Sequence, residues 1–424
     1  MAAITTLEKF EKTKPYNLFF NIIEKIPETV NQVNAIRFKD LLCPSLGVVK
    51  CSFLTAYVVD VEWLTSQYEQ MGLSFPQITI LTQKIRSQLN EARYPDVKLL
   101  QIPTTTEFHK HHSKLGIFVY DDESLRVVVS TANLNRKEWN KSNQGLWISP
   151  RLPKLPMNNK FETENPLKRP KIHDENNANI PGESVTGFKS DLLQYLKSYR
   201  TSIIEPAALE ELTSWIKYVE NADFSEVRVA FIYSALGQHE RYSNGTHLGG
   251  MEKMLSQHCN IPSSENGVPW EIITQTSSVG AIGTGLSGWM ESCFLRSMTS
   301  QNEPEGQTSR GSLNIKCIFP SERNVEHGIC GRNGAGGLFY VENNPPMWFK
   351  QYLFHWKADQ KHRTRAMPHI KTYCRISPEL DKIGYYLLTS ANLGPGAWGM
   401  RHFTIKDYNA ISYEVGCSCR NFLI

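Results

Sequence analysis

The sequence predicts an α/β protein made of two similar domains, each an α-β-α sandwich around a mixed β-sheet. Short apolar, β-branched runs that suit buried strands alternate with amphipathic helical segments in both halves of the chain. A polar motif in the first half also recurs in the second half at nearly the same internal spacing, which indicates a duplication. We therefore expect two domains related by a pseudo-two-fold axis, with one shared site at their interface.

The predicted elements follow from these local patterns. In the first half, strands are predicted at 47–53, 77–82, 98–102, 115–120, 125–130 and 145–149. Helical periodicity predicts helices at 188–199 and 207–220, and strands resume at 227–233, 271–276, 314–319 and 384–389. With 424 residues, the chain is long enough for two domains, which we place at 1–205 and 206–424.

Residues 151–183 interrupt this pattern. They are rich in Pro, Asn, Lys and Glu and poor in aromatic residues, so we expect a solvated, mobile loop. The cluster Lys168–Lys171 inside it has two interpretations: the tip of a charged loop, or a short nuclear import signal.

Bulk properties exclude some classes of protein. The N-terminus lacks the apolar core of a signal peptide, and no apolar run approaches the length of a membrane span. Nine scattered cysteines without C-x-x-C pairs favour reduced intracellular thiols; Cys417 and Cys419 are the only close pair. A net charge of +4 permits an anionic partner without requiring one.

The repeated motif consists of His-x-Lys followed by Asn. His112 and Lys114 precede Asn133 by 21 and 19 residues, and His369 and Lys371 precede Asn392 by 23 and 21. A Trp follows each Asn after six residues. In an extended backbone, residues i and i+2 point to the same face. Each His and Lys should therefore project together, and the two sets should converge on one cleft.

This set of side chains suits a phosphate ester. Two ammonium groups and two carboxamides can hold the phosphate oxygens, while one imidazole attacks phosphorus and the other carries a proton. No carboxylate cluster fit for Mg²⁺ is evident, so metal-independent chemistry without a cofactor is expected. His109, His111 and His112 could instead form a metal site, but Lys110 and Lys114 beside them disfavour a cation.

The two units resemble the phospholipase D superfamily, whose motif is His-x-Lys followed by Asp. Asn133 and Asn392 stand where that Asp would be, and this departure is similar to the tyrosyl-DNA phosphodiesterase family. The resemblance extends over most of the chain, through segments 111–114, 188–192, 277–280, 367–373, 388–394 and 412–416.

The resemblance implies a role for each residue of the motif. His112 would attack the phosphorus that joins a DNA 3′ end to a tyrosine of a stalled topoisomerase, and His369 would protonate the departing tyrosine and then activate water. The Lys and Asn residues would hold the phosphate oxygens. Glu414 would orient His112 and Gln144 would orient His369, each across the domain interface.

The resemblance also implies contacts with DNA. Phe108 would stack on a base, while Ser278 and the backbone near Gly394 and Gly396 would contact phosphates. From the residues alone, Phe108 could close a strand end and Ser278 could cap a helix. The family has a polar Ser-Lys where this chain has Gly394-Pro395, which puts one phosphate contact in doubt. The family also continues beyond the equivalent of Ile424, so we expect the second domain to be truncated.

The favoured prediction is therefore a monomeric, nuclear DNA repair phosphodiesterase that acts on a 3′ end carrying a tyrosyl peptide, in single strands or frayed duplexes. The alternatives are another phospholipase D superfamily enzyme, such as a lipid hydrolase or general nuclease, and a non-catalytic nucleic-acid-binding protein.

Overall fold

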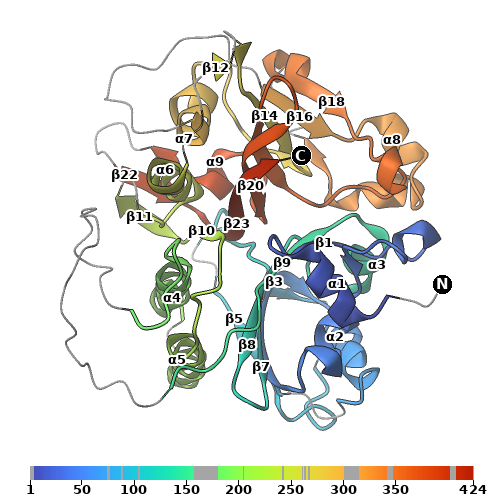
Figure 1. The fold of residues 1–424 in the computed structure, drawn as a ribbon, viewed down its shortest axis with the longest axis vertical. Coiled ribbons are helices and arrows are strands. Elements are labelled where there is room, and N and C mark those ends of the chain that lie inside the picture. Colours follow the sequence, from blue (N-terminus) through green and yellow to red (C-terminus); the bar gives the residue numbers. More distant parts are fainter. Residues whose placement is uncertain are drawn as a thin grey trace.

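Two large mixed β-sheets dominate the computed structural model, one in each half of the chain (Figure 1). The structure describes residues 4–73, 77–86, 89–103, 106–156, 180–203, 205–240, 243–259, 261, 264–265, 268–299, 315–340, 347–401 and 407–423. Lys168–Lys171 and most of the predicted loop 151–183 lie outside the described residues.

The first sheet has eight strands. In spatial order they are β2 (Ala35–Ile36), β1 (Leu18–Asn21), β9 (Gly145–Ile148), β8 (Leu125–Ser130), β7 (Leu115–Tyr120), β3 (Val49–Val59), β4 (Gln77–Ile85) and β5 (Val97–Gln101). The strands β3, β4 and β5 run parallel to one another, whereas β1, β9, β8, β7 and β3 pair antiparallel in series.

The second sheet repeats this arrangement. In spatial order its strands are β10 (Ala230–Ser234), β23 (Ser412–Leu423), β20 (Lys382–Thr389), β19 (Thr372–Ile376), β14 (Glu271–Gln275), β16 (Ile315–Phe319) and β18 (Leu353–His355). Neighbouring strands from β10 to β18 pair as four antiparallel pairs followed by two parallel pairs. The strands from β1 to β5 of the first sheet show the same order of pairing. The mixed α/β class is thus confirmed, and the pseudo-two-fold relation remains a prediction.

One strand joins the halves. β6 (Lys110–His111) comes from the first half but pairs in parallel with β23, placing Lys110 opposite Ser412 and His111 opposite Tyr413. The remaining strands are short and peripheral: β11 (Gly237–Glu240), β12 (Ser264–Glu265), β13 (Val268–Pro269), β15 (Ser278–Val279), β17 (Phe339–Tyr340), β21 (Met400–Arg401) and β22 (Asp407–Ala410).

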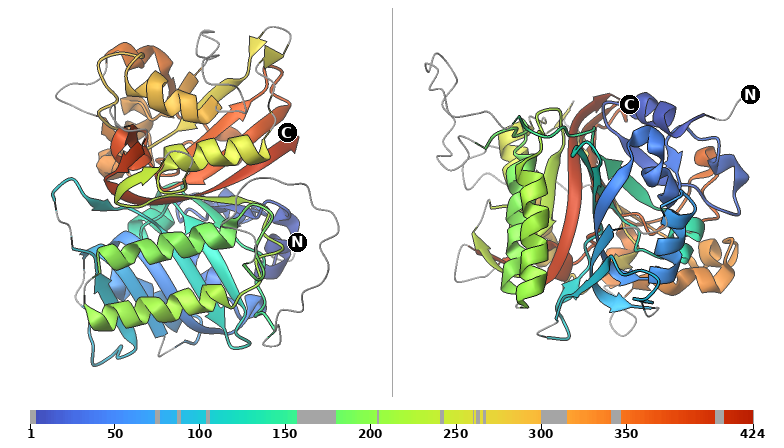
Figure 2. Two further views of the ribbon diagram at one scale, coloured as in Figure 1. Left: turned by 90° about the vertical axis from the view of Figure 1, so that its left-hand side faces the viewer. Right: turned by 90° about the horizontal axis from the view of Figure 1, so that it is seen from below.

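Helices cover the sheets in layers (Figure 2). The α-helices are α1 (Thr6–Thr13), α2 (Val61–Glu69), α3 (Arg136–Lys141), α4 (Phe188–Ser198), α5 (Pro206–Glu220), α6 (His247–His258), α7 (Arg296–Thr299), α8 (Glu322–Glu326) and α9 (Pro395–Trp398). A π-helical segment, η5 (Met290–Leu295), runs directly into α7.

Alternating side chains of the first sheet build two cores. Ile117 and Val127 face the side covered by α4 and α5, whereas their neighbours Phe118 and Val128 face the side of α1 and α2. The first of these cores also contains Val415 and other residues of the second sheet, so one continuous apolar cluster spans both halves. This shared core fixes how the two sheets meet.

Helix α5 packs on the first sheet rather than on the second. Glu211 binds Thr79 and Lys98, both at 2.5 Å, and the Trp215 indole donates to Thr79 over 3.0 Å. Figure 2 shows α4 and α5 side by side over that sheet. The packing therefore favours a division after Glu220, and the boundary between residues 205 and 206 stays a prediction.

Several predicted elements agree with the structure. The strands at 115–120 and 125–130 have the predicted bounds, and α4 and α5 begin or end within one residue of them. The predicted strand at 47–53 is part of a longer strand, because β3 continues to Val59, where Asp60 caps α2 by accepting from the Trp63 amide over 3.1 Å. All nine cysteines are unpaired. Among the described residues, no helix is both long and apolar enough to cross a membrane.

Gly145 allows the two sheets to approach each other. A Cβ placed on it would lie 2.5 Å from Ile370 Cδ1 and 2.7 Å from Leu388 Cδ1, both buried side chains of the second half. We predict that Gly145→Ala lowers the free energy of unfolding by about 1–3 kcal/mol through overpacking, measured by urea denaturation. Gly285→Ala, which adds its methyl group to open space, is the control and should change stability little; equal stability of both variants would contradict the prediction.

Candidate active site

The extended backbone around His112 sends alternate side chains in opposite directions. His111 and Ser113 point into the protein, where the His111 ring bonds the Tyr199 hydroxyl over 2.8 Å and Tyr195 donates to Ser113 over 2.5 Å. His112 points the other way, toward Glu414. The structure thus separates His111 from His112, and within the described residues no group of His, Cys, Asp or Glu converges as around a metal ion.

Pairing of β6 with β23 brings Glu414 to His112. The His112 amide donates to the Tyr413 carbonyl over 2.9 Å, which places the next residue of β23 beside the imidazole. His112 Nδ1 then lies 3.0 and 2.9 Å from the two Glu414 carboxylate oxygens, and the Ser390 hydroxyl donates to the same carboxylate. Because Nδ1 donates to Glu414, the neutral ring leaves Nε2 with a free lone pair.

His369 has three acceptors around its Nδ1 atom. These are the Thr131 carbonyl at 3.1 Å, Gln144 Oε1 at 3.3 Å and Glu138 Oε2 at 3.5 Å, all from the first half. The His369 amide also donates to the Asn143 carbonyl over 2.9 Å. The Thr131 hydroxyl holds the Gln144 side chain in place over 2.7 Å. Each imidazole is therefore oriented by residues of the opposite half.

Glu138 is a site residue that the sequence did not reveal. Asn135 caps α3 by accepting from the Glu138 amide over 3.1 Å, which turns the Glu138 carboxylate back toward the start of the helix. There it accepts from both the backbone amide and the side chain of Asn133, over 2.7 and 2.9 Å. Its counterpart in the second motif is Ala397, so comparison of the two motifs gives no signal for it.

Both asparagines are held by their oxygen atoms. Asn133 Oδ1 accepts from the backbone amides of Tyr57 and Val58 over 3.0 and 3.3 Å. Asn392 Oδ1 accepts from the Thr276 hydroxyl and from the amide and hydroxyl of Ser277, over 3.0 to 3.3 Å. Asn133 Nδ2 uses one of its N–H groups on Glu138, whereas Asn392 Nδ2 has no acceptor among the described residues. An Asp would present an anionic oxygen there, so Asn gives these positions donors suited to an anion.

The two lysines are cations in an unfavourable setting. Burial, only partly offset by Glu414 and Glu138, lowers the pKa of Lys114 to about 8. Burial and the nearby Lys114 ammonium hold the pKa of Lys371 well below its ordinary value. Each ammonium group donates to the carbonyl of its own motif histidine, at 2.5 Å. The site therefore holds the ammonium groups of Lys114 and Lys371 in a buried space, where a nearby anion would favour their charged forms.

The imidazoles and carboxylates have complementary shifts. Burial and Lys371 lower the pKa of His369 to about 3, against the opposing effect of Glu138. Burial also lowers the pKa of His112, although Glu414 opposes it. The pKa of Glu414 falls to about 2 because His112, Lys114 and Ser390 outweigh the effect of burial. While the site holds no anion, His112 and His369 are therefore neutral at pH 7, and Glu138 and Glu414 are ionised.

The four predicted DNA contacts lie around this centre. Phe108 is 66% exposed, and Ser278 pairs with Phe339 between β15 and β17. Gly394 approaches the backbone of Gly280, because a Cβ on Gly394 would lie 3.3 Å from Gly280 Cα. Gly396 lies within α9, close to the side chain of Ile411. Their contacts with DNA remain predictions.

Comparisons with known proteins point to one family. A family model described as tyrosyl-DNA phosphodiesterase matches residues 17–419. Tyrosyl-DNA phosphodiesterase 1 of Drosophila melanogaster is 33% identical over 399 residues, covering 92% of this chain and 63% of the relative. The Arabidopsis thaliana protein of the same name is 28% identical over 410 residues, covering 93% of this chain and 62% of the relative. The chain thus spans less than two thirds of the length of these curated relatives.

A solved structure supports the fold. The yeast tyrosyl-DNA phosphodiesterase aligns with a TM-score of 0.67 at 22% identity, covering 95% of this chain and 89% of that chain.

Buried neutral histidines make stability dependent on pH. Burial lowers the pKa of His111 to about 3 and of His247 to about 4. Below their ordinary value near 6.5, the unfolded chain binds protons that the folded chain does not. We predict that the free energy of unfolding falls as pH drops from about 6.5 toward 4, by about 2 kcal/mol or less per histidine between pH 6.5 and 5.

Urea denaturation at several pH values measures this effect. His247 bonds Ser234 and Thr389 over 2.7 Å each, so His247→Gln should lose stability at pH 7.5 but show a shallower decline with acid. A stability that is constant from pH 7.5 to 5 would contradict the prediction.

Proposed function

The chain belongs to the tyrosyl-DNA phosphodiesterase family, and from this premise we propose that it hydrolyses the bond between a DNA 3′ phosphate and a tyrosine side chain. The observation that carries the proposal is the crossed site: two His-x-Lys-Asn sets, each with its imidazole oriented from the opposite half. The asparagine donors and buried ammonium groups suit a phosphodiester anion.

In the first step His112 acts as the nucleophile. Its Nδ1 donates to Glu414, so the Nε2 lone pair attacks phosphorus and forms a P–N bond. The P–O bond to tyrosine breaks, and the proton of His369 moves to the tyrosine oxygen. The negative substrate raises the pKa of His369 when it binds, which reverses part of the effect of burial and of the lysines.

In the second step His369 acts as a base. The neutral imidazole takes a proton from water, the oxygen attacks phosphorus, and the P–N bond to His112 breaks. The product is a DNA 3′ phosphate with both histidines restored. Lys114, Lys371, Asn133 and Asn392 stabilise the phosphate oxygens in both steps. No step draws on a metal ion or a cofactor.

The finer features of the proposal follow from the substrate. A repair enzyme for DNA ends acts in the nucleus, on single-stranded or frayed 3′ ends. A monomer suffices, because the two halves of one chain already supply both motifs. The second candidate is another phosphodiesterase of the phospholipase D superfamily, which the same paired motifs would serve.

A direct assay tests the function and the roles together. A single-stranded oligonucleotide ending in 3′-phosphotyrosine, incubated with EDTA, should give the 3′ phosphate. We predict that His369→Ala slows the second step about 10²–10⁴-fold and accumulates a covalent DNA–protein adduct, whereas His112→Ala forms none. Denaturing gel electrophoresis detects the adduct. An adduct in His112→Ala would reverse the roles, and hydrolysis of a phospholipid in place of the oligonucleotide would favour the second candidate.

Glu138 should raise the pKa at which His369 loses its proton. Its carboxylate lies 3.5 Å from His369 Nδ1 and raises the pKa of that imidazole. Glu138→Gln removes the charge, so His369 loses its proton at a lower pH. We predict that the alkaline limb of the kcat profile, which reports the enzyme–substrate complex, shifts to lower pH by roughly 0.5–1 unit.

The matched control is Glu24→Gln, an exposed carboxylate paired with Arg136 at 3.2 Å. It should leave the profile in place. If Glu138→Gln lowers activity uniformly without moving the limb, its role is limited to holding Asn133.

A further inference from the structure

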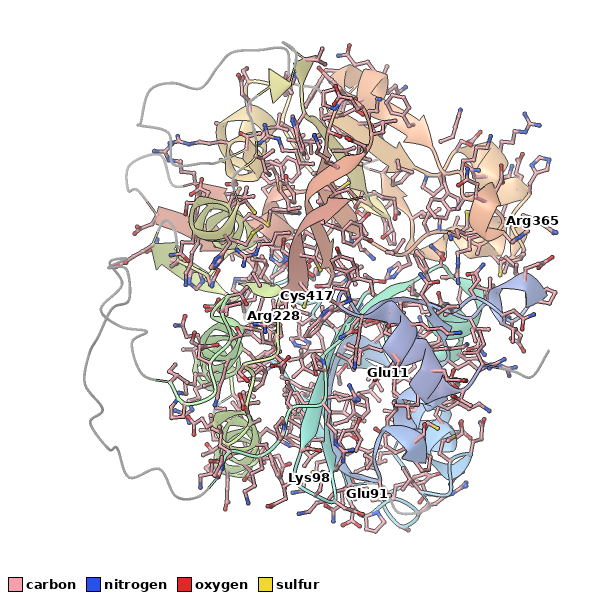
Figure 3. The ribbon with its side chains drawn as sticks, in the orientation of Figure 1. Glu11, Glu91, Lys98, Arg228, Arg365 and Cys417 are labelled. Carbon is pink, nitrogen blue, oxygen red and sulfur yellow. The ribbon has the colours of Figure 1, made fainter. Side chains whose placement is uncertain are left out.

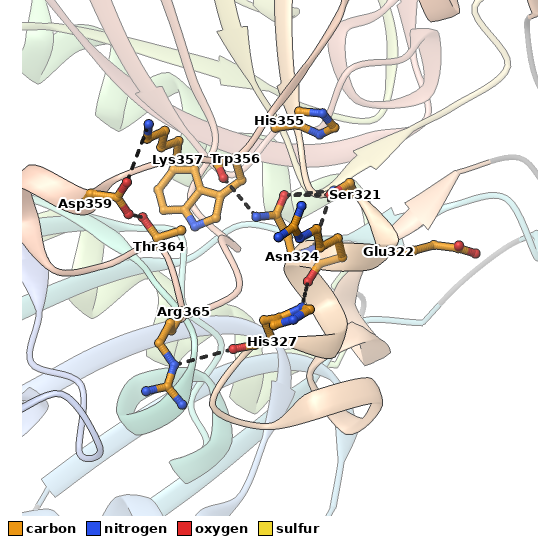
Figure 4. A pocket seen from close by; sticks show the side chains of 11 residues that line it. Ser321, Glu322, Asn324, His327, His355, Trp356, Lys357, Asp359, Thr364 and Arg365 are labelled. Carbon is orange, nitrogen blue, oxygen red and sulfur yellow. Dashed lines mark hydrogen bonds and ion pairs between the residues drawn. The ribbon is translucent and has the colours of Figure 1, made fainter.

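A separate pocket with charged side chains in its lining lies in the second half. It encloses about 800 Å³ between α8 and the segment that follows β18 (Figure 4). Its lining residues are Ser321, Glu322, Arg323, Asn324, His327, His355, Trp356, Lys357, Asp359, Thr364 and Arg365. The proposed reaction uses none of them.

Hydrogen-bond donors in this pocket are left without acceptors. The Trp356 indole is buried, with 9% of its surface exposed, and its Nε1 has no partner among the described residues. Arg365 uses Nε on the His327 carbonyl at 3.4 Å, and its two terminal nitrogens have no acceptor among the described residues. Arg323 makes no ion pair or side-chain hydrogen bond with a described residue. Figure 4 shows Trp356, His327 and Arg365 around the same space.

The acids of the pocket do not cancel these charges. Asp359 is already engaged, because it pairs with Lys357 at 3.7 Å and accepts from the Thr364 hydroxyl. Glu322 is exposed at the rim. Among the described residues of the lining, two guanidinium groups without a carboxylate partner therefore outnumber the one unpaired carboxylate, Glu322. Guanidinium groups bind oxyanions through paired hydrogen bonds, so the pocket suits one carboxylate or phosphate group.

Two segments lead from this pocket to His369. Residues 365–369 begin at Arg365 and end at the catalytic imidazole, a span of at most about 14 Å for four extended residues. The glycine-rich segment from His327 to Gly337 runs beside them. A Cβ on Gly334 would lie 3.3 Å from Met367 Cγ, and one on Gly337 would lie 3.2 Å from His369 Cδ2. A smaller hollow lined by Met367, His369 and these glycines lies between.

We propose that this pocket binds an acidic side chain of the peptide attached to the DNA. The inference rests on the proposed function, in which His369 protonates the tyrosine oxygen and the leaving peptide lies on its side of the phosphorus. A peptide of about four extended residues spans the distance from His369 to Arg365. The enzyme would then favour adducts that carry Asp or Glu a few residues from the linking tyrosine.

The charges favour a peptide over the DNA backbone. A phosphodiester strand carries a negative charge at every nucleotide and would pass the free Glu322 as well as Asp359. An isolated carboxylate needs only the two arginines, and it can leave Glu322 to a basic residue of the same peptide.

The test compares three substrates on one oligonucleotide: a 3′-phosphotyrosine, a phosphotyrosyl peptide with Asp or Glu three and four residues from the tyrosine, and the same peptide with Asn or Gln there. We expect wild-type kcat/KM to be about five- to tenfold higher for the acidic peptide than for the amide peptide. In the Arg323→Ala/Arg365→Ala double variant this ratio should fall to about 1.

Arg228→Ala is the matched control, because Arg228 is also exposed and lies in the middle of the view in Figure 3, away from Arg365 at its margin. It should keep the wild-type ratio. Equal cleavage of both peptides by wild type would overturn the inference. So would an equal loss on all three substrates in the double variant, which would assign the pocket to DNA phosphates. Failure of wild type on 3′-phosphotyrosine alone would instead refute the proposed function.

Discussion

The site depends on one interaction between the two halves: the short parallel pairing of β6 with β23. The His112 amide donates to Tyr413, and this single register places Glu414 against the imidazole, where both carboxylate oxygens lie within 3.0 Å of Nδ1. A shift by one residue would turn Glu414 to the opposite face of the strand. The catalytic geometry is therefore a property of the interface, and neither half could form it alone.

The two halves build their orienting groups in the same way but complete them differently. A hydroxyl directly before each Ala-Asn, Thr131 or Ser390, bonds the side chain that orients an imidazole. That side chain is neutral Gln144 for His369 and anionic Glu414 for His112. Glu138 reduces this difference, because it adds a carboxylate near His369 at 3.5 Å, beyond direct hydrogen-bond distance. In the proposed mechanism, the direct contact with Glu414 suits His112 as the nucleophile. The more distant Glu138 leaves His369 able to give and take a proton.

Local patterns predicted the elements, and the repeat predicted which residues meet. The β-branched runs at 115–120 and 125–130 specify strands by themselves. The Thr-Ala-Asn and Ser-Ala-Asn turns also contain the hydroxyls that hold Gln144 and Glu414, a signal that the two motifs share. Other features depend on three-dimensional contacts between distant segments. The packing of α5 on the first sheet depends on Thr79 and Trp215, which are far apart in the sequence. The role of Glu138 depends on the cap that Asn135 forms at the start of α3.

Charge explains why the site is best regarded as incomplete without its substrate. Burial lowers the pKa of both lysines, Lys114 lowers that of Lys371 further, and both histidines stay neutral in their presence. Asn133 and Asn392 add N–H donors beside the two ammonium groups. A phosphodiester placed among these donors would add a negative charge, so that the lysines hold their protons more tightly and His369 can acquire one. In the proposed mechanism the anion thereby creates the protonation state that its own cleavage requires, since protonated His369 would be the acid for the departing group. Substrate binding and protonation of His369 would therefore have the same electrostatic cause. That cause is the partial or complete burial of four donor side chains, those of Lys114, Lys371, Asn133 and Asn392.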